Sequence, residues 1–108
     1  MNEKLLKNIN HYGLRTELRK LNEECYELIE AIKDYEFQKE ACESVGCSRI
    51  HVDKERKHVV EEIADVQVLL NQFKLYYGIS DEEVKEVMIK KIDRQMERIK
   101  ERYIWKKD

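Results

Sequence analysis

Two short acidic stretches share one pattern, and the spacing of their carboxylates suits the binding of a cation. The stretches are residues 21–28 and 59–66. Each holds two acidic residues three positions apart, and these pairs are Glu24 with Glu27 and Glu62 with Asp65. Residues three apart are neighbours on a helix surface. Carboxylates that meet must be neutralised by protons or by a cation, and oxygen-only ligands suit Mg²⁺, with Mn²⁺ as the alternative.

Each acidic pair lies beside a stripe of apolar residues at helical spacing. A helix turns by about 100° per residue, which groups the apolar residues of each stretch on one face. The two stripes are Leu21, Cys25, Leu28 and Ile32, and Val59, Ile63, Val66, Leu70 and Phe73. Glu24 and Glu27 lie at the edge of the first stripe, on the side that also carries Glu17, whereas Glu23 points away. Such acids could be a solvated flank, but their repetition in the same phase favours a shared site.

The paired motifs resemble those of a known enzyme family. The two motifs are Glu23-Glu24-x-x-Glu27 and Glu62-x-x-Asp65. They are similar to the signature of the MazG-like, all-alpha nucleoside triphosphate pyrophosphohydrolases, whose relatives include phosphoribosyl-ATP pyrophosphatase and the dimeric dUTPases. The run Glu-Glu-Ile-Ala-Asp-Val at 61–66 is also typical of these chains, and the resemblance covers roughly residues 14–100.

The resemblance implies hydrolysis of a nucleoside triphosphate to the monophosphate and pyrophosphate, by attack on the α-phosphorus. The implied metal ligands are Glu24, Glu27, Glu62 and Asp65. A carboxylate would polarise the attacking water, and the candidates are Glu23, Glu24 and Glu27. A basic edge on the expected last helix, formed by Lys91, Arg94 and Arg98, either faces solvent or binds the phosphates. MazG-like chains often carry Lys and Arg at such places, which favours substrate binding.

Length and composition favour a single all-α domain over residues 1–108. Charged residues make up 41% of the chain and proline is absent, and both features favour long helices. The net charge of −2 gives no general attraction for nucleic acid or membranes. Without a signal segment or a spanning apolar run, we expect a cytoplasmic protein. The helices are too few to cover their stripes, so we expect a homodimer or homotetramer.

Glycines divide the chain into expected helices. The predicted helices are residues 2–11, 16–38, 54–77 and 81–103, the second and third packing antiparallel in a bundle with the last against them. Gly13 and Gly78 end helices, Thr16 is the expected N-cap of the second helix, and Ser80 with Glu83 forms a capping box. Residues 41–53 lose the apolar period and are predicted to form a loop.

Three other interpretations deserve comparison. A zinc site would use Cys42, Cys47, His51 and His58, but their spacing is unlike that of common zinc sites, so thiols in a loop are favoured. A di-iron bundle needs Glu-x-x-His pairs, and both repeats here have an acid in place of His. A non-catalytic helical interaction module would use the same apolar stripes and leave the acids solvated. The base and the sugar of the substrate are not indicated.

Overall fold

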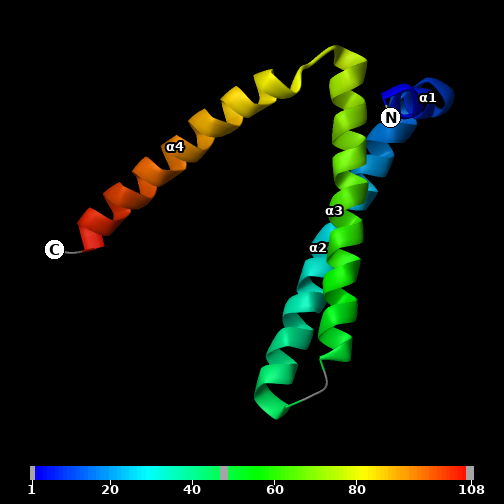
Figure 1. Cartoon of the computed structure of the whole chain (residues 1–108). Coiled ribbons are helices and arrows are strands. Elements are labelled where there is room, and N and C mark those ends of the chain that lie inside the picture. The colour runs from blue at the N-terminus through cyan, green and yellow to red at the C-terminus, as the bar shows by residue number, and fades with distance from the viewer. Residues whose placement is uncertain (1, 47–48, 107–108) are drawn as a thin grey trace. The chain divides into compact units, whose positions relative to one another are not determined.

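The computed structural model describes residues 2–46 and 49–106, with side chains up to residue 102. Over these ranges the regular structure is helical throughout, which confirms the prediction of an all-α fold. The helices are α1 (Asn2–Tyr12), α2 (Leu14–Val45), α3 (Ile50–Tyr77) and α4 (Asp81–Lys106) (Figure 1). Two compact units divide the chain between Tyr76 and Tyr77, so that α4 forms a unit separate from α1, α2 and α3.

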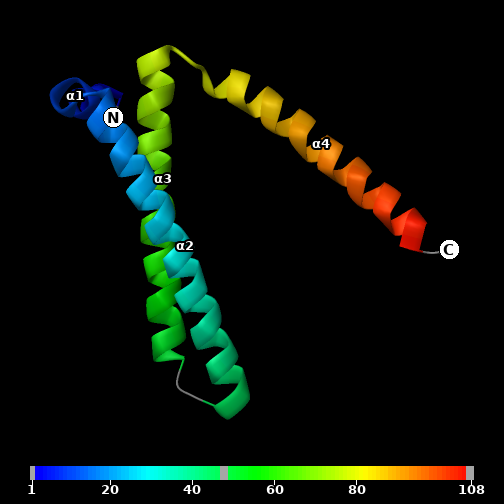
Figure 2. The same ribbon diagram turned by 180° about the vertical axis from the view of Figure 1, so that it is seen from behind.

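Helices α2 and α3 run side by side in opposite directions, as predicted (Figures 1 and 2). Their less exposed residues alternate at spacings of three and four. On α2 these residues are Glu17, Leu21, Glu24, Leu28, Ala31 and Tyr35, and on α3 they are Val52, Glu55, Val59, Glu62, Val66, Leu69 and Phe73. This spacing keeps one face of each helix towards its neighbour over several turns. We call the two rows together the α2–α3 seam.

The seam is rotated from the predicted stripes towards the acidic edge of each helix. Ile32, Ile63 and Leu70, which were expected in the core, are 43%, 42% and 47% exposed, so their predicted burial is wrong within the unit formed by α1, α2 and α3. Glu62 and Ala31 are buried instead. The small Ala31 side chain permits close approach on this side. The rotation brings the acidic edges together and leaves an apolar face of α2 and of α3 uncovered by the other helices of their unit.

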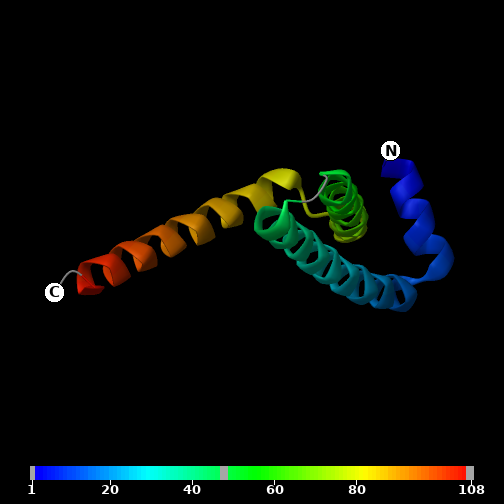
Figure 3. The same cartoon turned by 90° about the horizontal axis from the view of Figure 1, so that it is seen from below.

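Helix α1 covers the start of α2 through its apolar side. Leu5 and Ile9 are buried. The chain changes direction between α1 and α2 (Figure 3) at Gly13, whose φ of 88° is a conformation that glycine adopts without strain. Gly13 rather than Thr16 occupies the N-cap position of α2, so the predicted cap is wrong and Thr16 lies inside the first turn.

The predicted loop at residues 41–53 is largely helical. Helix α2 continues to Val45 and ends at Gly46, which has a φ of 65° and donates its N–H to the carbonyl of Cys42 at 3.0 Å. Helix α3 then begins at Ile50. The apolar period ends before the helix does, because an exposed helix end needs no apolar stripe. The helix itself ends at Gly46, whose left-handed backbone conformation stops it.

The start of α4 is fixed by the predicted capping box. The Glu83 N–H donates to Ser80 Oγ at 3.1 Å, and the Ser80 N–H donates to Glu83 Oε2 at 2.7 Å. These reciprocal bonds satisfy two backbone donors at the helix end. Among the described residues, no helix combines the length and the apolar character that crossing a bilayer requires.

Candidate metal centre

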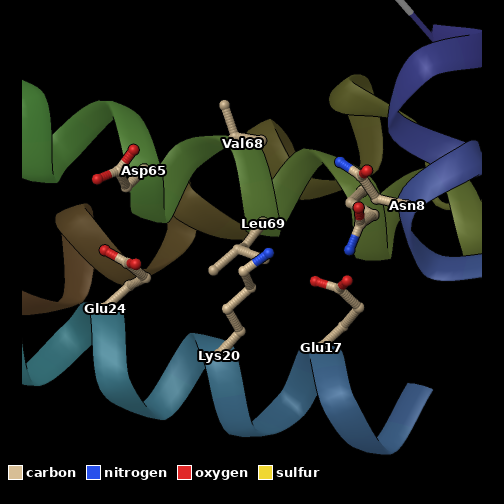
Figure 4. Close-up of a pocket in the computed structure, with 8 residues that line it drawn as sticks. Asn8, Glu17, Lys20, Glu24, Asp65, Val68 and Leu69 are labelled. Carbon is tan, nitrogen blue, oxygen red and sulfur yellow. The ribbon is translucent and has the colours of Figure 1, made fainter. Parts of the chain in front are cut away.

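Three carboxylates from two helices converge in the α2–α3 seam. Glu24 comes from α2, and Glu62 and Asp65 come from α3. One carboxylate oxygen of each lies within 4.8 Å of those of the other two. Figure 4 shows Glu24 and Asp65 facing each other across the helices. The rotation of both helices towards their acidic edges produces this acidic cluster, by which we mean Glu24, Glu62 and Asp65.

The other predicted acids of α2 lie outside the cluster. Glu27 is exposed and follows Glu24 by three residues, and its negative charge is near enough to act on Glu24. Glu23 is exposed on the same helix. The structure therefore brings together three of the four predicted metal ligands, with the fourth beside them.

Without a cation, the cluster favours the protonated form of one carboxyl group, that of Glu24. The pKa of Glu24 is raised to about 7, chiefly by burial and also by the charge of Glu27, a hydrogen bond with Glu62 and the charge of Asp65. Two carboxyl groups form a hydrogen bond with each other only when one of them is protonated. At neutral pH, Glu24 is therefore poised between its neutral and charged forms.

Unsatisfied oxygen atoms show that the cluster suits a cation. Oε2 of Glu24 and Oε2 of Glu62 are both buried, and neither has a hydrogen-bond partner among the described residues. Buried polar atoms are normally paired, because burial without a partner is costly. A hard divalent cation accepts such oxygen ligands from carboxylates. The donor set and its unpaired oxygens thus fit Mg²⁺ or Mn²⁺.

His58 contacts the cluster from within α3, a role that the sequence interpretation missed. Its Nε2 lies 3.2 Å from Oε1 of Glu62, one helical turn away. An imidazole N–H that donates to a ligand carboxylate fixes the orientation of that carboxylate. The signal was available in the sequence, since residues four apart lie on the same helix face. His58 had been considered only as part of the zinc alternative.

The zinc and di-iron alternatives find no matching group of side chains in the part of the chain that the structure describes. There, the side chains placed to hold a metal together are carboxylates. Cys42 lies within α2 rather than in a loop, and Cys47 lies outside the described residues.

A narrow pocket extends from the acidic cluster towards α1. Its volume is about 140 Å³. The residues that line it come from three helices and are Asn8, Glu17, Lys20, Glu24, Asp65, Val68, Leu69 and Gln72 (Figure 4). Glu17 was noted in the sequence for sharing a face with Glu24, whereas Asn8, Lys20 and Gln72 carried no signal there. The pocket therefore joins the candidate cation ligands to a second group of polar side chains.

The predicted basic edge lies on α4. Lys91 and Arg94 line one shallow groove, and Arg98 lines another on the same helix. Because α4 belongs to the separate unit, its position relative to the acidic cluster stays a prediction.

Comparison with known protein families identifies a match that covers most of the chain. A family model described as the MazG nucleotide pyrophosphohydrolase domain matches residues 13–100. This range includes both acidic motifs and the basic edge of α4. No curated protein and no solved structure matches the chain.

Proposed function

The chain belongs to the MazG nucleotide pyrophosphohydrolase family, and we propose that it hydrolyses a nucleoside triphosphate to the monophosphate and pyrophosphate in the presence of Mg²⁺ or Mn²⁺. The proposed metal ligands are Glu24, Glu27, Glu62 and Asp65. The observation that carries the proposal is the convergence of three carboxylates, two of which, Glu24 and Glu62, each have a buried oxygen without a hydrogen-bond partner among the described residues. When bound, a divalent cation would neutralise phosphate charge and hold the phosphates in place.

The chain's own carboxylates would manage the proton. Water attacks the α-phosphorus, the bond from that phosphorus to the bridging oxygen breaks, and a proton leaves the water. The candidate acceptors are Glu23, Glu24 and Glu27. Glu24 lies in the acidic cluster itself. Glu27 is the alternative beside it, and Glu23 is exposed on the same helix. His58 would act on Glu62 as a positioning residue.

Substrate phosphates would also be bound by Lys91, Arg94 and Arg98. These side chains follow one edge of α4 at spacings of three and four, so they would act on one ligand. Guanidinium and ammonium groups form charge-assisted hydrogen bonds with phosphate oxygens.

Self-association is supported by the apolar faces left uncovered by the α2–α3 seam. Leu18 and Ile32 of α2 and Ile63 and Leu70 of α3 are between 42% and 49% exposed. A homodimer or homotetramer would bury such residues, since large apolar patches on soluble proteins mark interaction sites. The same faces favour a second candidate function, a non-catalytic helical interaction module.

Pyrophosphate release from a panel of nucleoside triphosphates tests the proposal. We expect release that requires Mg²⁺ and stops when the metal is chelated. If no triphosphate yields pyrophosphate with either Mg²⁺ or Mn²⁺, the chain acts as the interaction module instead.

A further inference from the structure

The pocket beside the acidic cluster ends in polar side chains that the proposed chemistry does not use. We propose that this end binds the base of the nucleotide and recognises guanine, through Glu17 and Gln72. This inference rests on the proposed function, since it assumes that the phosphates lie at the acidic cluster. It deepens that function by naming the base.

Glu17 and Gln72 are unusual in being almost fully buried while each has one polar atom without a partner among the described residues. Each is 1% exposed. Oε1 of Glu17 and Nε2 of Gln72 have no hydrogen-bond partner among the described residues, and both side chains line the pocket. One is an acceptor and the other is a donor, so a ligand that satisfies both must offer a donor and an acceptor on the same edge.

The spacing along α2 fits a nucleotide. Glu17 precedes Glu24 by seven residues, which is about 10 Å along a helix. This length is comparable with that of a nucleoside monophosphate from its phosphate to the far edge of its base. It also places Glu17 too far from the acidic cluster to share its cation. Figure 4 shows Lys20 on α2 between Glu17 and Glu24, where its ammonium can accompany a phosphate or a sugar hydroxyl.

The hydrogen-bonding pattern selects guanine among the common bases. A carboxylate accepts hydrogen bonds and, when ionised, donates none. Guanine presents two adjacent donors, the ring N1–H and the exocyclic N2–H, next to the acceptor O6. Glu17 would accept from both donors, and the amide of Gln72 would donate to O6, with Asn8 beside it. Adenine, cytosine and uracil lack two adjacent donors.

The pocket walls agree with a flat ring. Val68 and Leu69 are the apolar residues among those that line the pocket. The volume of about 140 Å³ is below the roughly 300–1,000 Å³ of pockets that enclose drug-sized ligands. The space therefore suits one ring system rather than a whole nucleotide, and the phosphates would lie outside it at the acidic cluster.

The comparison of GTP with ITP isolates the contact with Glu17, because hypoxanthine lacks only the exocyclic amino group of guanine. We expect wild-type kcat/KM with Mg²⁺ to be about 10- to 100-fold higher for GTP than for ITP, the value of one hydrogen bond to a charged group. Glu17→Gln should bring this ratio close to one, mainly by lowering the GTP value. Glu40→Gln, an exposed residue of the same helix, should keep the wild-type ratio. A wild-type ratio near one, or an equal loss for both substrates in Glu17→Gln, overturns the proposal.

A binding experiment separates this inference from the proposed function. Calorimetry with GMP and IMP in the presence of Mg²⁺ measures base recognition without hydrolysis, because a monophosphate has no phosphoanhydride bond to break. Tighter binding of GMP, lost in Glu17→Gln, supports the guanine pocket even if no triphosphate is hydrolysed. Equal binding of GMP and IMP overturns it, even if pyrophosphate is released efficiently.

Discussion

Replacing Glu24 by Gln should change how the stability of the metal-free protein depends on pH. In the folded chain the pKa of Glu24 is raised from its ordinary value of 4.5 to about 7. Between these values the folded state holds a proton that the unfolded state has lost. The resulting stabilisation is fully present below pH 4.5, declines as pH rises, and is lost above about 7. Wild-type protein without metal should therefore be less stable at pH 8 than at pH 5.

The magnitude follows from the size of this change. A pKa raised from 4.5 to about 7 corresponds to about 3 kcal/mol if nothing screens it. Glu24 is half-buried, so solvent screening reduces the expected contribution to about 1–2 kcal/mol. For a domain of this size, that is about 5–10 °C in Tm. Gln is neutral at every pH and keeps a donor for Glu62. Glu24→Gln should match wild-type near pH 5 and exceed it near pH 8.

Thermal unfolding followed by circular dichroism measures the effect, with chelator or with millimolar Mg²⁺. At pH 8, Mg²⁺ should raise the Tm of wild-type protein, because ligand binding to the folded state stabilises that state. It should have little effect on Glu24→Gln, which lacks one of the proposed metal ligands. Glu40→Gln should follow wild-type throughout. If Glu24→Gln shows the same pH dependence as wild-type without metal, the proton does not lie on Glu24 and the reasoning is wrong.

Three further predictions concern the other proposed groups. Asp65→Ala or Glu62→Ala should nearly abolish pyrophosphate release and weaken Mg²⁺ binding in calorimetry while the helical signal is retained; wild-type activity in both variants would refute the metal site. Arg94→Ala should lower kcat/KM about 10- to 100-fold, whereas Lys100→Ala, on the other side of α4, should not; similar values for the two would make the basic edge a solvated face. Ile63→Asp should shift light scattering towards the monomer, and a monomeric wild-type protein at micromolar concentration would count against self-association.

Helical periodicity predicted most of the fold because glycines and a capping box mark the helix ends in this chain. Gly13, Gly78 and the Ser80–Glu83 box were all readable from local chemistry and lie where expected. The connection after α2 is shorter than predicted, because its residues stop being apolar before they stop being helical. Local propensity, not periodicity, decides such an exposed end.

The sequence identified residues of the candidate site, but it did not predict which face α2 and α3 turn towards each other. The repeated spacing named Glu24, Glu62 and Asp65, which the structure brings together. It also placed Ile63 in the core, where the structure has Glu62 instead. A shift of one residue around a helix depends on side-chain packing between two helices, which a single-helix pattern does not contain. The contact of His58 with Glu62 was missed because the position of a histidine one turn from an acid becomes informative only when that acid is known to be buried.

Placing acids in the seam links the fold to the proposed chemistry. Two helices that packed through the centres of their apolar stripes would bury Ile63 and Leu70 and leave the acids at the edge of the interface. Here the seam instead takes in Glu62 and Glu24, leaves buried oxygens without partners among the described residues, and exposes the apolar residues. A cation would satisfy the oxygens, and a second copy of the chain would cover the apolar faces. Each addition offsets a cost that the single metal-free chain carries, so cation binding and self-association should both raise stability.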